Sequence, residues 1–230
     1  MRIAGAALVA GLAAAPAFAG RPLTTDDAAV VEDKGCQLET WVDRSRNATI
    51  GWAAPACNFG FGIEWQAGFA RVRVEGSESF SDEYVQLKKL LREPTEASPW
   101  GVAITLGANR HSRAGSYDGW DNPYVLIPIT VISGAFTLHV QPGWARDRAT
   151  GRDLVAWGIA GEAEASERLA FVAEVFGENS RNPFVRAGLR WTLIRNHLSI
   201  DLTQVVRAGG ERTDRFTSFG VAIQTGAILP

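Results

Sequence analysis

The sequence predicts an all-β protein, an antiparallel up-and-down transmembrane β-barrel of about 12 strands within a range of about 10 to 14. Three observations favour this class. The chain begins with an export signal, apolar and polar residues then alternate along many segments of about ten residues, and longer loops alternate with short ones. The 24 glycines and eight tryptophans are a heavy share of 230 residues, as expected for strands with interfacial aromatic residues.

The N-terminus has the three parts of a bacterial signal peptide. Arg2 is followed by an apolar run to about Ala15 and then by Ala17-Phe18-Ala19, the small-x-small pattern that signal peptidase cleaves. The run is shorter than the ~20 residues of a membrane-spanning helix. We therefore expect cleavage near Ala19 and a location in the outer membrane of a Gram-negative bacterium. The predicted division is 1–19 signal peptide, 20–35 N-terminal segment and 36–230 β-barrel.

The only two cysteines, Cys36 and Cys57, flank a predicted hairpin. A tight turn at Arg46-Asn47 would place them directly opposite each other, with Cα atoms about 4.5 to 5.5 Å apart, within the range of a disulfide. A zinc site would need more Cys or His nearby, and two buried free thiols are the remaining alternative. We predict the disulfide, which agrees with an oxidising compartment. The same register places Trp41 opposite Trp52.

The strands follow from the period-two alternation. In 61–70, for example, Ile63, Trp65 and Phe69 share one face and Glu64 lies on the other. Similar alternation marks 100–109, 135–144, 155–165, 185–193, 197–204 and 218–225, and weaker strands are expected near 36–45, 48–57, 80–91, 123–132 and 169–177. The stretch 123–132 is apolar on both faces and contains Pro128.

The connections alternate in length after the first hairpin. The longer set comprises 110–122, 146–152, 177–183 and 206–214, and the shorter set comprises 58–60, 133–135, 165–168 and 193–197, with 93–99 as an exception. An outer-membrane barrel has short periplasmic turns and longer outer loops. Both termini are therefore expected in the periplasm.

The polar face of the strands is unusual for a soluble protein. It is made of Gly, Ala, Glu, Gln and Arg, and lysine occurs only at 34, 88 and 89. A secreted β-sandwich or a soluble barrel, the alternative fold, would place Lys, Glu and Thr on its solvated face. Small and paired polar residues instead suit a confined lumen, while lipid covers the apolar face of a closed sheet.

The charged positions of the polar face are candidate lumen residues. They are Glu39, Glu64, His139, Glu162, Glu174, Arg186, Arg190 and Asp201. A turn at Arg195-Asn196 would set Arg190 against Asp201, and Glu174 is expected to face Arg186. Because isolated charges are costly in such a space, mixed signs predict a paired network. The network is either interior filling or a charged constriction that selects solutes.

The segment 20–35 lacks alternation and carries several acids, so it either lies in the periplasm or folds into the lumen as a plug. Its "RPLTTDD" at 21–27, followed by "QLE" at 37–39, resembles the mature start of a family of outer-membrane proteins linked to the meta-pathway of phenol degradation. The resemblance implies a barrel that moves aromatic or other small apolar compounds.

Two functions are compared. The first is a passive channel or transporter for small solutes. The second is a closed structural barrel, or one that binds lipopolysaccharide or a partner. Arginines expected in outer loops, which would meet lipid phosphates, are Arg110, Arg113, Arg146, Arg148, Arg152, Arg207 and Arg212.

An enzyme is not expected, and no catalytic residue is assigned. His197 and Ser199 resemble the His-x-Ser of a lipid A deacylase, but the topology puts them at the periplasmic end, so a lipid-modifying enzyme ranks third. No metal spacing, phosphate loop or nucleotide fingerprint is present, so no metal or other cofactor is expected. The net charge of −2 gives no reason to expect nucleic acid.

Overall fold

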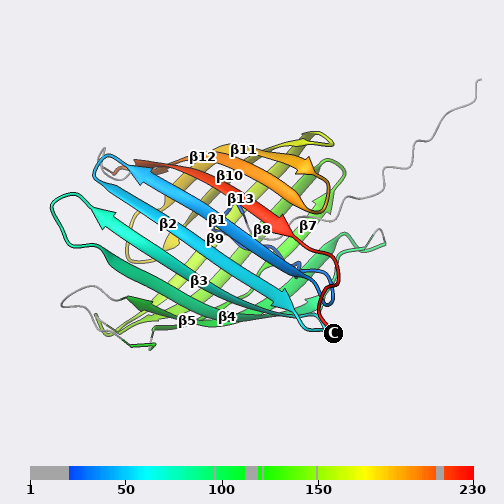
Figure 1. The fold of residues 1–230 in the computed structure, drawn as a ribbon, viewed down its shortest axis with the longest axis horizontal. Coiled ribbons are helices and arrows are strands. Elements are labelled where there is room, and N and C mark those ends of the chain that lie inside the picture. The colour runs from blue at the N-terminus through cyan, green and yellow to red at the C-terminus, as the bar shows by residue number, and fades with distance from the viewer. Residues whose placement is uncertain (1–20, 96, 112–118, 121, 149, 211–214) are drawn as a thin grey trace, which may run out of the picture.

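The chain forms one closed antiparallel barrel in the computed structural model, which describes residues 21–230 except 96, 112–118, 121, 149 and 211–214 (Figure 1). The strands are β1 (Cys36–Ser45), β2 (Ala48–Asn58), β3 (Ile63–Val74), β4 (Phe80–Arg92), β5 (Trp100–His111), β6 (Asn122–Leu126), β7 (Ile129–Ser133), β8 (Phe136–Asp147), β9 (Arg152–Ser166), β10 (Leu169–Glu178), β11 (Phe184–Ile194), β12 (Leu198–Arg207) and β13 (Arg215–Gln224). In the described part of the chain, no helix is long and apolar enough to cross a membrane.

The barrel closes because β1 pairs with β13 as well as with β2. β6 and β7 are two halves of one barrel strand, since each pairs with both β5 and β8. The break lies at Ile127-Pro128, where proline has no N–H for the ladder. Its carbonyl still accepts a hydrogen bond from the Ala103 N–H at 2.9 Å. The predicted fold, a closed barrel of 12 strands, is confirmed.

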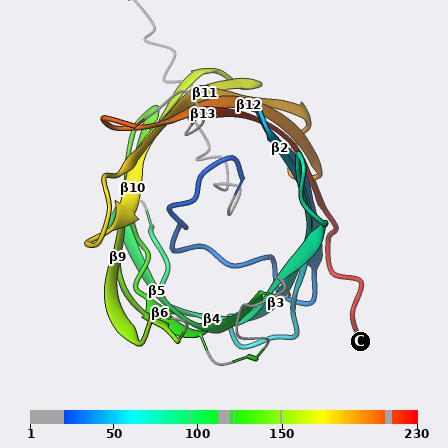
Figure 2. The same ribbon diagram turned by 90° about the vertical axis from the view of Figure 1, so that its left-hand side faces the viewer.

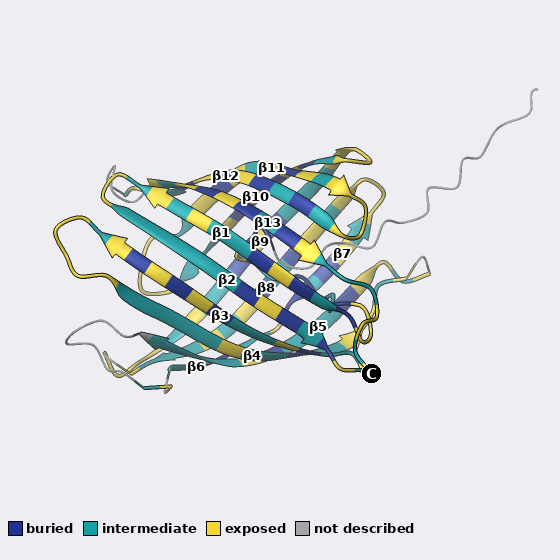
Figure 3. Cartoon of the chain, in the orientation of Figure 1, coloured by how far each residue is buried: buried dark blue, intermediate teal, exposed yellow. Residues whose placement is uncertain are grey.

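The barrel has an apolar outside and a polar inside, the reverse of a soluble protein. Buried and exposed residues alternate along strands such as β3 and β10, whereas β4 is largely of intermediate exposure (Figure 3). Exposed outward residues include Phe69, Ile159 and Leu202, and buried inward ones include Glu64, Thr105 and Asp201. Closure also satisfies the backbone groups of every edge, which hydrocarbon requires.

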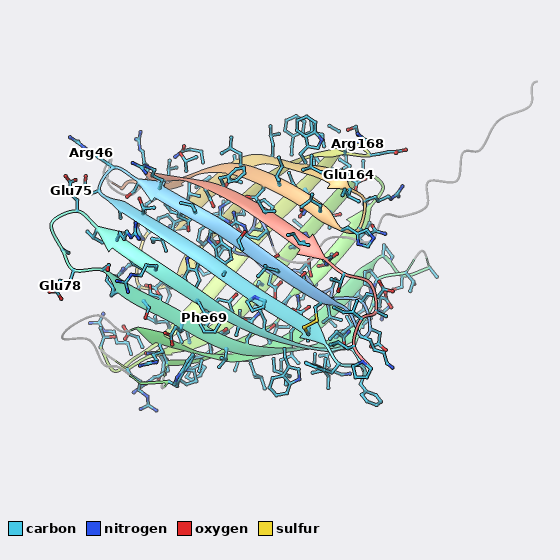
Figure 4. All side chains as sticks on the ribbon, in the orientation of Figure 1. Arg46, Phe69, Glu75, Glu78, Glu164 and Arg168 are labelled. Atoms are coloured by element: carbon cyan, nitrogen blue, oxygen red, sulfur yellow. A yellow bond between two sulfur atoms is a disulfide. The ribbon has the colours of Figure 1, made fainter. Side chains whose placement is uncertain are left out.

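Charged residues lie at both ends of the barrel (Figure 4). Arg46, Glu75 and Glu78 lie at the end with the longer loops, Glu164 and Arg168 lie at the other end, and Phe69 lies on the wall between them. The C-terminus lies at the end with the shorter turns (Figure 1). We call the two ends the loop end and the turn end.

The predicted disulfide is confirmed. Cys36 and Cys57 are cross-strand partners on β1 and β2, with Cα atoms 4.1 Å apart and an S–S bond between them. They lie at the turn end, where the hairpin opens towards the N-terminal segment. Trp41 and Trp52 are partners in the same register, as predicted.

Candidate functional site

A short peptide segment crosses the interior of the barrel. Residues 21–31, which we call the plug, lie within the ring of strands (Figure 2). Leu23, Thr25, Ala28 and Val31 are almost fully buried there, with exposed fractions of 8%, 1%, 0% and 2%. Of the two positions considered from sequence, periplasm or lumen, the structure has residues 21–31 in the lumen.

Side chains of the wall bind the plug backbone, which makes no strand pairs of its own. The carboxylate of Glu174 accepts hydrogen bonds from the N–H groups of Thr24 and Thr25, at 2.8 and 2.9 Å. Further amides donate to Glu39, Glu64, Thr130 and Gln141, at 3.0, 2.7, 2.9 and 2.8 Å. These acceptors satisfy buried backbone donors that would otherwise oppose burial of the segment.

Two ion-pair clusters fix the charged side chains of the plug. Nζ of Lys88 lies 2.9 Å from Oδ1 of Asp26 and 3.3 Å from Oδ1 of Asp27. At the other end of the plug, Arg21 Nη2 lies 2.8 Å from Asp201 Oδ1. Enclosure in the lumen raises the pKa of the Asp26 carboxyl, and the Lys88 ammonium opposes part of that rise.

The wall of the lumen has its own ion pairs beside the plug. Arg186 Nη1 lies 3.0 Å from Glu174 Oε1, the pair expected from the sequence, and Arg186 also donates to the Pro22 carbonyl. Arg190 donates to Glu162 with two nitrogens. Arg186 thus pairs with Glu174, which accepts hydrogen bonds from the plug, and Arg190 pairs with Glu162, which lies beside His139.

The predicted Arg190–Asp201 ion pair is wrong, although the register is right. The two residues face each other across β11 and β12. Asp201 instead binds Arg21 of the plug, and Arg190 turns to Glu162 on β9. The plug contributes a cation of its own, which the wall pattern alone does not reveal.

His139 links the plug to the wall network. Its Nδ1 lies 2.9 Å from Thr130 Oγ1, which also accepts the N–H of Ala28 at 2.9 Å. Its Nε2 lies 3.7 Å from Glu162 Oε1. A hydroxyl, an imidazole and a carboxylate arranged one after another in space suggest a catalytic triad. Here, however, the hydroxyl of Thr130 accepts a hydrogen bond from the Ala28 N–H of the plug. The arrangement therefore acts as an anchor.

Glycine in the wall makes room for the plug at two points. A Cβ atom on Gly158 would overlap Oγ1 of Thr25. A Cβ atom on Gly220 would lie 2.7 Å from Nη2 of Arg21. Both residues are inward-facing, so a side chain at Gly158 would collide with Thr25 and one at Gly220 would collide with the Arg21–Asp201 ion pair.

The loop-end half of the lumen has a different character. Its inward rings are Trp41, Trp52, Phe80, Tyr84, Tyr124, Phe176, Phe184 and Phe216. Trp41 and Trp52 stack at 5.4 Å, and Phe176 and Phe184 stack at the same centroid distance. All but Tyr124 keep intermediate exposure although they point inwards. We call this region the aromatic half. Its two indoles, Trp41 and Trp52, share the inward face of β1 and β2 with Glu39, as the register of the predicted hairpin implies.

The sequence-predicted lumen residues surround the plug. All are inward-facing, and seven of the eight, Glu39, Glu64, His139, Glu174, Arg186, Arg190 and Asp201, are buried; Glu162 is of intermediate exposure. Sequence reasoning missed Lys88, Thr130 and Gln141. Lys88 had a usable signal, since its position in β4 shares the parity of inward residues, whereas Lys89 faces outwards.

The remaining candidates lie away from the plug. His197 is exposed in the turn before β12, and its Nδ1 lies 3.1 Å from the Gln224 carbonyl oxygen. Among the arginines expected in outer loops, Arg110 pairs with Glu83 and Arg146 with Asp153. Arg113 and Arg212 lie outside the described residues. Within the described ranges, no group of three or more His, Cys, Asp or Glu could hold a metal ion.

A family model described as "Uncharacterised conserved protein UCP029691" matches residues 7–225. The chain belongs to this family. The match spans the plug and nearly the whole barrel, so family UCP029691 includes both parts. No curated protein matches the chain significantly.

Solved structures similar to this member of the family include two porins and an outer-membrane phospholipase. A KdgM porin matches with a TM-score of 0.61 and 8% identity over 81% of this chain and 98% of that one. A NanC porin gives 0.56 and 8% over 83% and 98%. Outer membrane phospholipase A from Escherichia coli gives 0.52 and 11% over 84% and 97%. At such identities these likenesses establish the fold and leave activity open.

Proposed function

We propose that this protein is an outer-membrane channel for small apolar or aromatic solutes and that its plug holds it closed. The observation that carries the proposal is the division of the lumen. A peptide segment occupies the polar, turn-end part, while partly exposed rings line the loop-end part. Wall side chains can fill an eight-stranded barrel, whereas this wider barrel holds a peptide segment as well and leaves its loop-end part lined by partly exposed rings.

The plug is held by contacts that can be broken. Hydrogen bonds and ion pairs bind it, and it adds no strand to the wall, which is closed by the β1–β13 pair without it. Residues 32–34 are exposed at the turn end, and Gly35 N–H donates to Glu32 O at 2.8 Å in a tight turn. This turn connects the plug to β1 and is a natural hinge.

The aromatic half favours flat, apolar solutes. Stacked and tilted rings contact aromatic molecules favourably through offset or edge-to-face geometry. The resemblance of residues 21–27 and 37–39 to proteins of phenol degradation supports the same class. One of the similar solved structures is a KdgM porin in complex with disordered oligogalacturonate, which is a ligand of that protein.

A closed barrel that binds lipopolysaccharide or a partner is the alternative. It is supported by the arginines near the loop end, which carry charge suited to lipid phosphates. The pairs Arg110–Glu83 and Arg146–Asp153 already use part of that charge. We therefore rank this alternative second.

Conductance in planar bilayers tests the proposal. The processed protein is compared with a variant that lacks residues 20–31, each checked for insertion and for the Cys36–Cys57 bond. We expect rare openings from the full protein and a steady current from the variant. Silence of both over many verified insertions would overturn the proposal in favour of a closed barrel.

Solute class is tested in cells that express the same two proteins. The lipopolysaccharide leaflet slows entry of the apolar dye N-phenyl-1-naphthylamine, so added permeability is visible as fluorescence. We expect the plug-deleted barrel to admit the dye faster than glucose, relative to an empty vector. If the entry of the dye and the entry of glucose rise equally, the protein is still a channel, but the proposed preference for apolar solutes is refuted.

A further inference from the structure

An apolar pocket lies on the outer wall, over strands β2 to β5. Its volume is about 640 Å³. Its outward-facing lining combines large residues, Trp65, Val85 and Leu106, with the small residues Pro55, Ala67 and Ala108. The large residues are 56%, 45% and 49% exposed. The pocket is therefore a hollow in the lipid-facing surface, with larger side chains around smaller ones.

The wall behind the pocket has an interrupted hydrogen-bond ladder. Pairing of β2 with β3 runs to Ala53↔Phe69 and resumes at Ala56↔Gln66. Pro55 lies in the interruption and has no N–H to donate. Gly68, on the facing strand, has no side chain to pack there. We call this part of the β2–β3 pair the seam.

The inner surface of the seam belongs to the aromatic half. The Tyr84 ring covers Gly68 so closely that a Cβ atom there would overlap it. Trp52 lies 5.9 Å from Tyr84 between ring centroids. The pocket lining also includes Gln66 and Gln86, whose positions face the lumen. Pocket, seam and aromatic rings thus adjoin across one thickness of sheet.

We propose that the seam is a lateral opening, through which a small apolar aromatic solute passes between the aromatic half and the outer pocket. The inference rests on the proposed channel function and adds the route. An apolar solute in the aromatic half meets buried charges and the plug on the turn-end side. An apolar solute that entered that polar region would displace hydrogen-bond partners of buried protein groups and offer none in return, which costs free energy. The seam leads instead to hydrocarbon.

The solute fits the pocket better than a fixed lipid chain does, for a reason visible in the wall. A pocket that only binds an acyl chain does not require an interrupted hydrogen-bond ladder in the wall beneath it. Here the pocket lining includes Pro55 and Ala67, which face each other at the one place where the described β2–β3 ladder is interrupted, and an aromatic ring covers the inner side.

Restoring the ladder is the direct experiment. Pro55→Ala supplies the missing N–H and should close the seam. In cells that express the plug-deleted barrel, we expect this substitution to lower N-phenyl-1-naphthylamine uptake by about tenfold, the equivalent of one backbone hydrogen bond. Pro142→Ala is the matched control, because Pro142 is an outward-facing strand proline on β8, away from the pocket. It should leave uptake unchanged.

A second variant fills the pocket without touching the ladder. Ala67→Phe should also reduce dye uptake, whereas Ala173→Phe, on the exposed outer face of β10, should not. As an independent readout, the ion current of the plug-deleted barrel is measured with each of the four substitutions, Pro55→Ala, Pro142→Ala, Ala67→Phe and Ala173→Phe. It should not change, because ions take the axial path.

The outcomes separate the inference from the function it builds on. Unchanged dye uptake in Pro55→Ala and Ala67→Phe, with a normal current, overturns the lateral route and leaves the channel. If Ala67→Phe lowers the amount of lipid that co-purifies with the protein but leaves dye uptake unchanged, the pocket binds an acyl chain, and the lateral route is also overturned. Absence of both current and uptake in the plug-deleted barrel refutes the channel itself.

Discussion

Nζ of Lys88, on the wall, lies 2.9 Å from Oδ1 of Asp26, in the plug, and the lysine side chain is only 2% exposed. Lys88→Met would leave Asp26 and Asp27 without this cation in an enclosed space. Removing one partner of a buried pair typically costs about 3 to 5 kcal/mol. Since the barrel wall closes without the plug, we expect most of that loss in plug binding, seen as more frequent openings in planar bilayers.

Lys89→Met is the matched control for this prediction. Lys89 is adjacent on β4 but faces outwards, where it donates to the Phe61 carbonyl near the turn end. It should conduct like the unmodified protein. If Lys88→Met and Lys89→Met behave alike, the Lys88 contact does not hold the plug.

Steric exclusion gives a second prediction. Gly158→Ala introduces a Cβ atom that overlaps Thr25, and overpacking of this kind costs about 1 to 3 kcal/mol. Gly161→Ala, on the same strand, meets nothing within 4 Å. We expect Gly158→Ala to raise the protease sensitivity of the N-terminal segment in folded protein and Gly161→Ala to leave it unchanged. Equal digestion would argue against close packing of the plug at Gly158.

The wall could be predicted from the sequence because its pattern is local. Alternation fixes which residues face inwards, and turn positions fix register, so Arg190 opposite Asp201 and Glu174 opposite Arg186 follow without a structure. Register places backbones, but it does not choose ion-pair partners among several long side chains. Arg190 reaches Glu162 on β9 because Asp201 is taken by Arg21.

The plug could not be placed from sequence for a related reason. Residues 21–31 have no period, and their amides bind acceptors from strands far apart in the chain, such as Glu64 and Glu174. Such contacts become visible only after the barrel has closed. The division of the lumen into aromatic and polar halves could not be predicted either. It depends on the position of each residue along the barrel axis as well as on whether its side chain faces inwards.

The stacked indoles give a third prediction. Trp41 and Trp52 lie 5.4 Å apart with planes 14° from parallel. An aromatic contact is worth about 0.5 to 1.5 kcal/mol beyond area, so Trp52→Leu should weaken binding of N-phenyl-1-naphthylamine by roughly twofold to tenfold. Trp191→Leu, on the exposed outer face, should have no effect. Titration in detergent micelles measures both, and equal affinities would refute a role for the lumen indoles.

The disulfide gives the last prediction, which concerns stability. Cys36 and Cys57 are 21 residues apart in the chain and join β1 to β2 beside the turn that leads to the plug. Closing a loop of this length limits the unfolded chain and contributes about 3 kcal/mol. The Cys36→Ser, Cys57→Ser double variant should therefore unfold at lower urea concentration in detergent, and reducing agent should reproduce the effect in the parent protein only. Because the β1–β13 and β2–β3 pairs do not depend on the bond, the variant should still fold and keep its plug. An unchanged urea midpoint would mean that the hairpin remains ordered in the unfolded ensemble, and that the bond serves assembly instead of equilibrium stability.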